Sequence, residues 1–444
     1  MRAAPASLLR LLRATPYDRP ILALAVPALG ALAADPLVSL VDTAFVGHLG
    51  PKALGALGVN AAVFSLVFFL FNFLAYGTTP LVGQALGEGR PEAARRTVGQ
   101  AVVLAMGIGL VVLAVLGTLA GPILTAMGAG AELVAPALVY LRIRALAAPA
   151  VLLVMVGHGA FRGYQDTRTP LLITLGLNAV NLTLDPLLIF GLGWGIAGAA
   201  WGTVAAQWFG AAWFVGLLVR RELTLLSWRT GGTELLRLLR VGGDLTLRTL
   251  ALLGTLTLAT AVAARLGTVA VAAHQVAAQL WGFLALVVDA LAIAAQALVA
   301  RLLGSGNQEA ARLAAGRMLQ WGVLLGLLLG VGFWALQGLL PGIFTDDPGV
   351  TAAVMTVLPF VAAMQPLNSA VFVWDGVFMG AGDFPFLAKA MLLAAGAAGI
   401  VLLLVLPLGW GLVGVWWGMV TLMLVRALTL GARYFSGRGP LNRV

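Results

Sequence analysis

The sequence predicts an all-α integral membrane protein with twelve transmembrane helices in two six-helix lobes related by a parallel repeat. Hydrophobic residues make up 61% of the 444 residues and charged residues only 10%, whereas a soluble domain carries about 25% charged residues. Twelve stretches are apolar over the roughly 20 residues that a membrane-crossing helix needs. The two halves also share landmarks in the same order. A soluble enzyme and a disordered chain are therefore excluded.

The twelve stretches are continuous apolar runs rather than alternations of apolar and polar residues, which indicates helices and not a membrane β-barrel. The predicted spans lie near 21–46, 54–86, 98–120, 133–160, 170–191, 195–219, 243–265, 270–300, 318–340, 350–379, 387–408 and 411–432. Cysteine is absent, so disulfides and thiolate metal sites are excluded.

The distribution of positive charge predicts the topology. The net charge is +10, and 20 of the 27 Lys and Arg residues fall in the two tails and in the even-numbered loops between spans. The odd-numbered loops hold only Lys52 and Arg265. Because Lys and Arg collect on the cytoplasmic side, both termini are expected there. The charge is explained by topology, so no nucleic-acid partner is expected.

The same pattern gives a division of the chain. It comprises a cytoplasmic N-terminal segment (1–20), an N-terminal lobe (21–219), a cytoplasmic linker (220–241), a C-terminal lobe (242–432) and a cytoplasmic tail (433–444). The N-terminal segment is expected to form a short helix on the inner membrane surface. In the linker, Gly231 and Gly232 precede a possible N-cap at Thr233, which predicts a flexible stretch followed by a short amphipathic helix.

An internal repeat relates the lobes. The tetrapeptide at 92–95 (EAAR) recurs at 309–312, an offset of 217. Each half has six spans, so both enter the membrane in the same direction, as in many secondary transporters. The two lysines, Lys52 and Lys389, do not follow glycine, so a Walker A phosphate loop is absent. We expect a gradient-driven transporter rather than an enzyme, with no cofactor.

Acidic residues in the first span are the leading functional candidates, because ionisable groups within the membrane are costly. Asp35 and Asp42 are seven residues apart, close to two helical turns, and should share one face. Pro27 and Pro36 favour kinks in the same helix. An acidic stripe on a bendable helix is typical of a proton or cation switch. The alternative is that Asp42 caps a kinked backbone or pairs with a buried arginine.

A polar stripe marks the fifth span. Asn178, Asn181 and Asp185 stand at i, i+3 and i+7, on one helical face. This spacing predicts that they face a cavity, the alternative being hydrogen bonds between helices. The repeat offset sends Asp42 to Ala259 and Asp185 to Leu402, so ion coupling is expected in the N-terminal lobe.

The second lobe supplies two further candidates for the substrate cavity, Arg248 and Asn368. Arg248 lies near the cytoplasmic end of its span, so the alternative is that it reaches the membrane surface. Two arginines also lie within the fourth span, Arg142 and Arg144. A paired acid is expected for them, either Glu132 or a carboxylate of the first span.

Four strings carry a resemblance to a known family: VDTAFVGHLG (41–50), GAFRGYQDTRTPL (159–171), NLTLDPLLIFG (181–191) and DGVFMGAGDF (375–384). With them, the chain resembles multidrug and toxic compound extrusion (MATE) transporters over essentially its full length, most closely the DinF-like branch. The resemblance implies a MATE-like fold and an antiporter that exports organic compounds against protons or sodium ions.

The resemblance to MATE transporters also implies which residues form the ion-coupling site. Asp42, within VDT, matches a key ion-coupling aspartate, and Asp185 with Asn181 matches the same N-lobe site. The acidic cation ligands of the C-terminal lobe in the NorM-like branch have no clear match here, and Asn368 stands in one such place. That departure favours protons over sodium.

The expected function is export of organic compounds, cationic or amphipathic, in exchange for protons by alternating access. The expected partners are small organic substrates, protons and the lipid bilayer, around a monomer. The arginine-rich, lysine-poor usage favours a prokaryotic inner (plasma) membrane. The alternatives are a sodium-coupled exporter, an organic-anion exporter using Arg142, Arg144 and Arg248, and a flippase for lipid-linked precursors.

Overall fold

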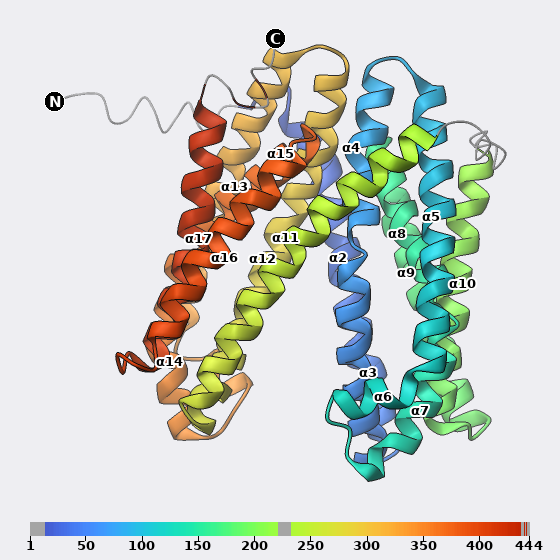
Figure 1. The fold of residues 1–444 in the computed structure, drawn as a ribbon, viewed down its shortest axis with the longest axis vertical. Helices are drawn as coiled ribbons and strands as arrows, with labels where there is room; N and C mark the ends of the chain where they lie inside the picture. Colours follow the sequence, from blue (N-terminus) through green and yellow to red (C-terminus); the bar gives the residue numbers. More distant parts are fainter. Residues whose placement is uncertain (1–13, 221–231, 437–438, 440, 442–444) are drawn as a thin grey trace. The chain divides into compact units, whose positions relative to one another are not determined.

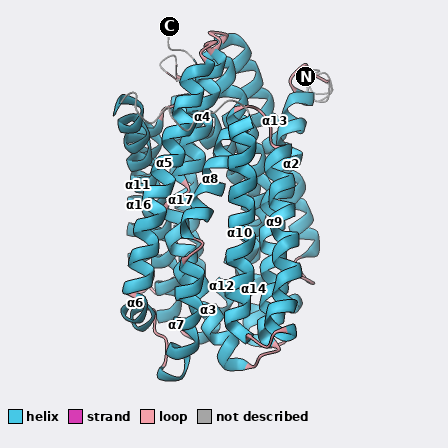
Figure 2. Cartoon of the chain, turned by 90° about the vertical axis from the view of Figure 1, so that its right-hand side faces the viewer, coloured by secondary structure: helices cyan, strands magenta, loops and turns pink. Residues whose placement is uncertain are grey.

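All regular structure in the described part of the chain is helical, which confirms the predicted fold class (Figure 2). The computed structural model describes residues 14–220, 232–436, 439 and 441. Of the N-terminal segment 1–20, expected to form a surface helix, residues 1–13 lie outside the described part, and residues 18–20 begin α2. The expected flexible stretch at 221–231 also lies outside the described part.

The helices follow one another with short connections (Figure 1). In the first half they are α2 (Asp18–Gly47), α3 (Pro51–Leu70), α4 (Phe73–Gly87), α5 (Pro91–Thr118), α6 (Ala120–Ala126), α7 (Ala131–Ala145), α8 (Ala148–Gly163), α9 (Arg168–Pro186), the π-helix η1 (Leu187–Gly191) and α10 (Gly195–Arg220). In the second half they are α11 (Gly232–Arg265), α12 (Thr268–Gly304), α13 (Gln308–Leu336), the 3₁₀ turn η3 (Pro341–Ile343), α14 (Pro348–Ala363), α15 (Gln365–Gly380), α16 (Phe384–Leu404) and α17 (Gly411–Phe435).

The number of apolar spans agrees with the prediction. Within the described residues, 10 segments are long and apolar enough to cross a membrane, and two bent helix pairs raise the number to 12 if each pair is one span. The segment expected to be a separate amphipathic helix before the seventh span instead forms the first turns of α11, which continues without a break to Arg265.

The two bent pairs occupy equivalent places in the repeat. The pair α7–α8 and the pair α14–α15 are each bent by 50°. Pro149 and Pro366, at the start of α8 and α15, are separated by 217 residues, the offset of the sequence repeat. Proline lacks the N–H that would continue the helical ladder and displaces the preceding turn. Both halves therefore contain a proline at the equivalent position, and it accounts for the break in each.

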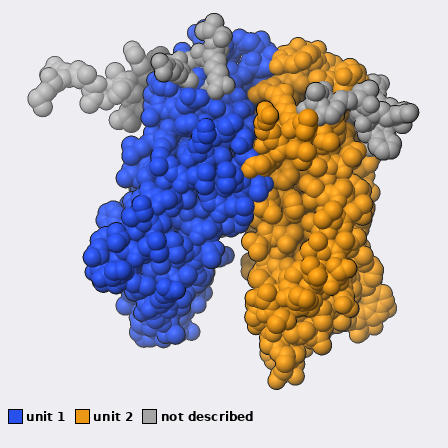
Figure 3. All heavy atoms as spheres, in the orientation of Figure 1, with its two compact units in different colours: residues 1–26, 244–444 blue, residues 27–243 orange. Residues whose placement is uncertain are grey.

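The chain divides into two compact units (Figure 3). One comprises residues 1–26 and 244–444, and the other residues 27–243. Two helices thus change unit along their length: α2 immediately before Pro27, and α11 after Gly243. The first turns of α2 pack with the second half of the sequence. The division predicted from the sequence instead assigned residues 21–219 as a whole to the N-terminal lobe.

A charged contact holds the start of α2 in the first unit. Arg317 binds Asp18 with two nitrogens, Nε to Oδ1 at 2.6 Å and Nη2 to Oδ2 at 3.0 Å. The indole Nε1 of Trp321 donates to the same carboxylate at 2.8 Å. Ile21 and Leu24 continue the contact into an apolar core with α12 and α13. Bidentate guanidinium–carboxylate pairs fix orientation as well as distance, so α2 begins from a defined anchor.

Candidate functional site

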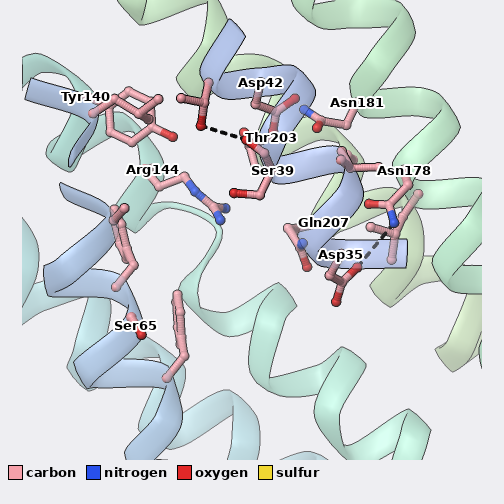
Figure 4. Close-up of a pocket in the computed structure, with 18 residues that line it drawn as sticks. Asp35, Ser39, Asp42, Ser65, Tyr140, Arg144, Asn178, Asn181, Thr203 and Gln207 are labelled. Carbon is pink, nitrogen blue, oxygen red and sulfur yellow. Dashed lines mark hydrogen bonds between the residues drawn. The ribbon is translucent and has the colours of Figure 1, made fainter. Parts of the chain in front are cut away.

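A cavity of about 360 Å³ lies within the unit formed by residues 27–243 (Figure 4). Side chains of α2, α3, α7, α9 and α10 surround it, and its polar lining comprises Asp35, Ser39, Asp42, Thr43, Ser65, Tyr140, Arg144, Asn178, Asn181, Thr203 and Gln207. Its volume is within the range of small-molecule sites, about 300–1,000 Å³. Charged groups inside an apolar helical unit make it the leading candidate site.

The acidic stripe of α2 faces this cavity. Asp35 and Asp42 both line it, which confirms that the seven-residue spacing places the two carboxylates on one face. Asn178 and Asn181 line it as well, so these two members of the polar stripe of α9 face a cavity as predicted, whereas Asp185 is buried behind the lining. The alternative, a hydrogen bond between helices, is also present. Asn178 Nδ2 donates to Asp35 Oδ1 at 3.2 Å.

Asp42 and Asp185 form a carboxyl pair. Asp185 is 1% exposed, and its side chain interacts directly with Asp42. Asn181 Nδ2 donates to Asp185 Oδ1 at 3.0 Å. Asp42 Oδ1 and Asp185 Oδ2 are both buried, and neither receives a hydrogen bond from a donor in the described residues. A single proton held between the two carboxylates would satisfy both oxygens.

The backbone of α10 makes room for this pair. A Cβ placed on Gly202 would lie 2.0 Å from Asp185 Oδ1. The carboxylate therefore rests against α10 where a side chain is missing. Immediately after Asp185, Pro186 ends α9 and the chain continues as the π-helix η1. Local π geometry is often found at functional positions.

A cation shares the cavity. Arg144 lies on α7, with its guanidinium 5.3 Å from the ring centroid of Phe64 and hydrogen-bonded to Tyr140. Of the two acid partners expected for Arg142 and Arg144, Glu132 is wrong, because it binds Lys52 at 3.1 Å. The other expected partner, a carboxylate of the first span, is present as Asp42, which interacts electrostatically with Arg144.

The other predicted residues lie in the unit of residues 244–444. Arg248 does not reach for the membrane surface but binds Asp375 Oδ2 at 2.7 Å, and Arg426 binds the same oxygen. Asn368 is buried in α15, and its Oδ1 has no hydrogen-bond donor among the described residues. The structure thus brings Asp35, Asp42, Asp185, Asn178 and Asn181 together in one unit, whereas Arg248 and Asn368 belong to the other unit.

Six polar lining residues were not singled out from the sequence, namely Ser39, Thr43, Ser65, Tyr140, Thr203 and Gln207, and Arg144 was considered only for the organic-anion alternative. Tyr140 and Arg144 on α7, and Thr203 and Gln207 on α10, stand at i, i+4, a spacing that places both members of a pair on one face. Such pairs of polar residues within apolar spans are the sequence signal from which these lining residues could have been found.

Comparison with known proteins decides the family. The MatE family model matches residues 27–187 and 247–405. The chain belongs to the MatE family. MatE proteins are transporters and not enzymes, so this chain is a multi-pass membrane protein of multidrug or toxic compound efflux.

Curated relatives extend over nearly the whole MatE chain. It is 36% identical to Protein DETOXIFICATION 44, chloroplastic, of Arabidopsis thaliana, over 95% of this chain and 82% of the relative. It is 30% identical to DNA damage-inducible protein F of Escherichia coli (strain K12), over 94% and 92% of the two chains. The latter agrees with the DinF-like resemblance of the sequence strings.

Solved MATE structures share the fold. The structure titled as MATE in the bent conformation is 22% identical with a TM-score of 0.87, and the one titled as MATE in the straight conformation is 23% identical with a TM-score of 0.83. Each match covers 95% of both chains.

Gly202→Ala is expected to reduce transport by this MatE protein severely, because the added methyl group would overlap Asp185 Oδ1 and push the carboxylate from Asp42. The measurement is efflux of ethidium from proteoliposomes, compared with Asp185→Asn, with thermal unfolding as a check on folding. Gly216→Ala on the same helix is the matched control, since a Cβ there meets nothing within 4 Å. Wild-type efflux by Gly202→Ala would show that the position of Asp185 does not matter.

Proposed function

We propose that this chain is a proton-coupled antiporter that exports organic compounds by alternating access. The observation that carries the proposal is the Asp42–Asp185 pair, which has two buried acceptor oxygens and no donor for them among the described residues. Two adjacent carboxylates in an apolar unit hold one proton more readily than two negative charges. The pair is thus a loading site for a proton that can be gained and lost.

The cavity lets the proton and a substrate influence one another. Asp42 contributes both to the pair and to the cavity lining. A proton on the pair removes negative charge from the wall against which a substrate lies, so proton binding and binding of a positively charged group oppose each other. That opposition is the requirement for exchange.

A bend of α2 would connect the proton to alternating access. Pro27 and Pro36 lie inside the helix, and the change of unit falls immediately before Pro27. Asp35 and Asp42 lie beyond that point, while Asp18 is held in the other unit. A MATE relative is described in bent and straight conformations. We place the hinge of the present chain at Pro27, with both termini on the cytoplasmic side of the inner membrane.

The test imposes one gradient at a time on purified protein in liposomes loaded with ethidium. A pH gradient, acid outside, should accelerate ethidium efflux several-fold over protein-free liposomes, with the membrane potential clamped by valinomycin and potassium. A sodium gradient at equal pH should not. An uncoupler that collapses the pH gradient is the control. Efflux driven by sodium alone, or by neither gradient, would contradict proton antiport.

One specific observation supports the alternative that the chain exports organic anions. Arg144 is a cation inside the cavity, whereas Arg142 is exposed and Arg248 is neutralised by Asp375. Of the three arginines that could bind an anion, only Arg144 is placed to do so.

A further inference from the structure

A second cavity, of about 270 Å³, adjoins the candidate cavity within the unit of residues 27–243. Asp35, Leu177 and Gln207 line both cavities, so the two meet at these side chains. The second cavity has further polar lining from Asn72, Tyr76, His158, Arg162 and Thr174. It has room for several water molecules, at roughly 30 Å³ each, and polar groups that can bind them, so it is suited to hold water.

The second cavity lies closer to the cytoplasmic side than the Asp42–Asp185 pair does. Its lining residue Ala31 precedes Asp42 on α2, and Thr174 precedes Asp185 on α9, by 11 residues in each case, which is about 16 Å along a helix axis. In the topology of the proposed function, α2 and α9 start at the cytoplasmic side and α8 ends there. Arg162, the last residue but one of α8, belongs to the same lining. The second cavity therefore extends from the candidate cavity toward the cytoplasm.

A contact between a histidine and an arginine stands at the cytoplasmic end of this cavity. Arg162 is 6% exposed, and its Nη2 lies 3.5 Å from His158 Nδ1. A guanidinium can only donate, so Nδ1 accepts and the imidazole carries its proton on Nε2. That nitrogen lies 3.3 Å from Thr174 Oγ1, and the ring of Phe214 packs against the imidazole at 5.3 Å between centroids. His158 is thus fixed by its neighbours and holds the guanidinium in the lining.

The charges that line the second cavity suit a gated path for protons. Its ionisable groups are Asp35 from α2, Tyr76 from α4, and His158 and Arg162 from α8, whereas α5, α9 and α10, which also pack on α8, contribute no ionisable side chain to the described lining. An arginine at a pore is a barrier to protons. A cation about 10 Å from a passing proton slows it about tenfold where the effective dielectric constant is near 20. Arg162 in this position therefore opposes the passage of a proton.

We propose that the proton of the Asp42–Asp185 pair leaves for the cytoplasmic side through the second cavity, and that Arg162, held by His158, is the gate of this path. The inference rests on the proposed function and adds to it an exit for the proton that the substrate does not share. The proton moves along water, so no side chain of the second cavity needs to change its charge. With Arg162 in the lining the path is closed, which prevents protons from crossing without substrate.

Blocking the second cavity tests the route. The chain has no cysteine, and Met155 lines the second cavity but not the candidate cavity, so Met155→Cys provides a single thiol on which benzyl methanethiosulfonate places an aromatic group. Ethidium efflux driven by a pH gradient should fall several-fold after modification and recover when dithiothreitol removes the group. Ethidium binding, measured by fluorescence polarisation without a gradient, should not change.

Met127→Cys is the matched control, since Met127 is 41% exposed and lines neither cavity. It should keep its efflux after the same treatment. Unchanged efflux by fully modified Met155→Cys would overturn the route.

Removing the arginine tests the gate. Liposomes loaded with pyranine, with the membrane potential clamped by valinomycin and potassium, report proton entry under a pH gradient, acid outside, with no substrate present. Arg162→Ala should acidify the lumen about tenfold faster than the wild type, the factor expected when the repulsion is lost, whereas Arg162→Lys keeps the charge and should stay near the wild-type rate. Adding Asp42→Asn to Arg162→Ala should stop this leak, because the proton must pass the carboxyl pair. No leak by a folded Arg162→Ala, or a leak that survives Asp42→Asn, would overturn the proposal.

Two histidine variants test the gate with the arginine still present. His158→Gln can accept from Arg162 and donate to Thr174, so it should keep the wild-type rate of proton entry. His158→Leu has no acceptor for Arg162 and should leak. Equal rates for the two variants would overturn the assignment of His158 as the residue that holds the gate, and thermal unfolding with ethidium binding shows that each variant is folded.

The outcome for the route is separate from the outcome for proton antiport. Failure of the antiport proposal appears in the wild type, as efflux driven by sodium alone or by neither gradient. Failure of the route appears only in the variants, as pH-driven wild-type efflux without the block at Met155→Cys and without the leak.

Discussion

Asp42→Asn should abolish efflux driven by a pH gradient while leaving the protein folded. Asparagine has nearly the size of aspartate but cannot gain and lose a proton, so the Asp42–Asp185 pair would lose its exchangeable charge. The amide can still donate to Asp185 Oδ2, which now lacks a donor in the described structure, so folding is not expected to suffer. The measurement is ethidium efflux from proteoliposomes under an imposed pH gradient, with Asp185→Asn beside it.

Two further variants locate the effect. Glu132→Gln removes an exposed carboxylate paired with Lys52 and should transport like the wild type. Asp35→Asn should weaken substrate binding but keep the dependence on the pH gradient, because Asp35 is not a member of the Asp42–Asp185 pair and binds Asn178 instead. Undiminished pH-driven efflux by Asp42→Asn would end the assignment of Asp42 as the proton carrier.

Much of the candidate site could be predicted from spacing along single helices. Asp35 and Asp42 at i, i+7, and the stripe from Asn178 to Asp185, each fix which side chains share a face, since helical periodicity depends on local geometry alone. Their approach to one another also follows from a simple rule, because polar groups in an apolar unit cluster away from lipid. The number of spans is equally local, being a matter of apolar length.

Partner choice between helices could not be predicted in the same way. Glu132 was expected, as one of two alternatives, beside Arg142 or Arg144, yet it binds Lys52, because which residues at the ends of α3 and α7 meet depends on tertiary packing. The room that Gly202 gives to Asp185 is likewise a property of two packed helices. Contacts between different helices do not recur at a fixed interval along the sequence, so helical periodicity does not predict them.

The bends between α7 and α8 and between α14 and α15, unlike the contacts between helices, had a signal in the sequence. Pro149 and Pro366 recur at the repeat offset, and each begins a helix after a 50° bend. A proline repeated at equivalent positions predicts a break in both halves, but only the prolines of the first span were interpreted as bends. The change of unit within α2 had no such signal, since it depends on Asp18 meeting Arg317, a residue 299 positions later.

Asp375→Asn is expected to destabilise the unit of residues 244–444 by about 3–5 kcal/mol, the usual cost of removing one partner from a buried ion pair. Arg248 from α11 and Arg426 from α17 both bind one oxygen of Asp375 on α15. Arg426 is 3% exposed and, among the described residues, donates further only to Met423 Sδ, while lying 5.9 Å from the ring centroid of Phe372. The measurement is thermal unfolding of the purified protein in detergent.

The number of charges left among Asp375, Arg248 and Arg426 in each variant provides a control for this prediction. The wild-type cluster has two cations and one anion, so Asp375→Asn leaves two buried cations without an anion, whereas Arg248→Leu leaves one ion pair with balanced charge. Arg248→Leu should therefore destabilise much less than Asp375→Asn, although each variant removes the same Arg248–Asp375 contact. Equal losses would show that the contact itself, and not the uncompensated charge, governs stability here. A smaller loss for Arg248→Leu would mean that Asp375 serves chiefly to neutralise Arg426.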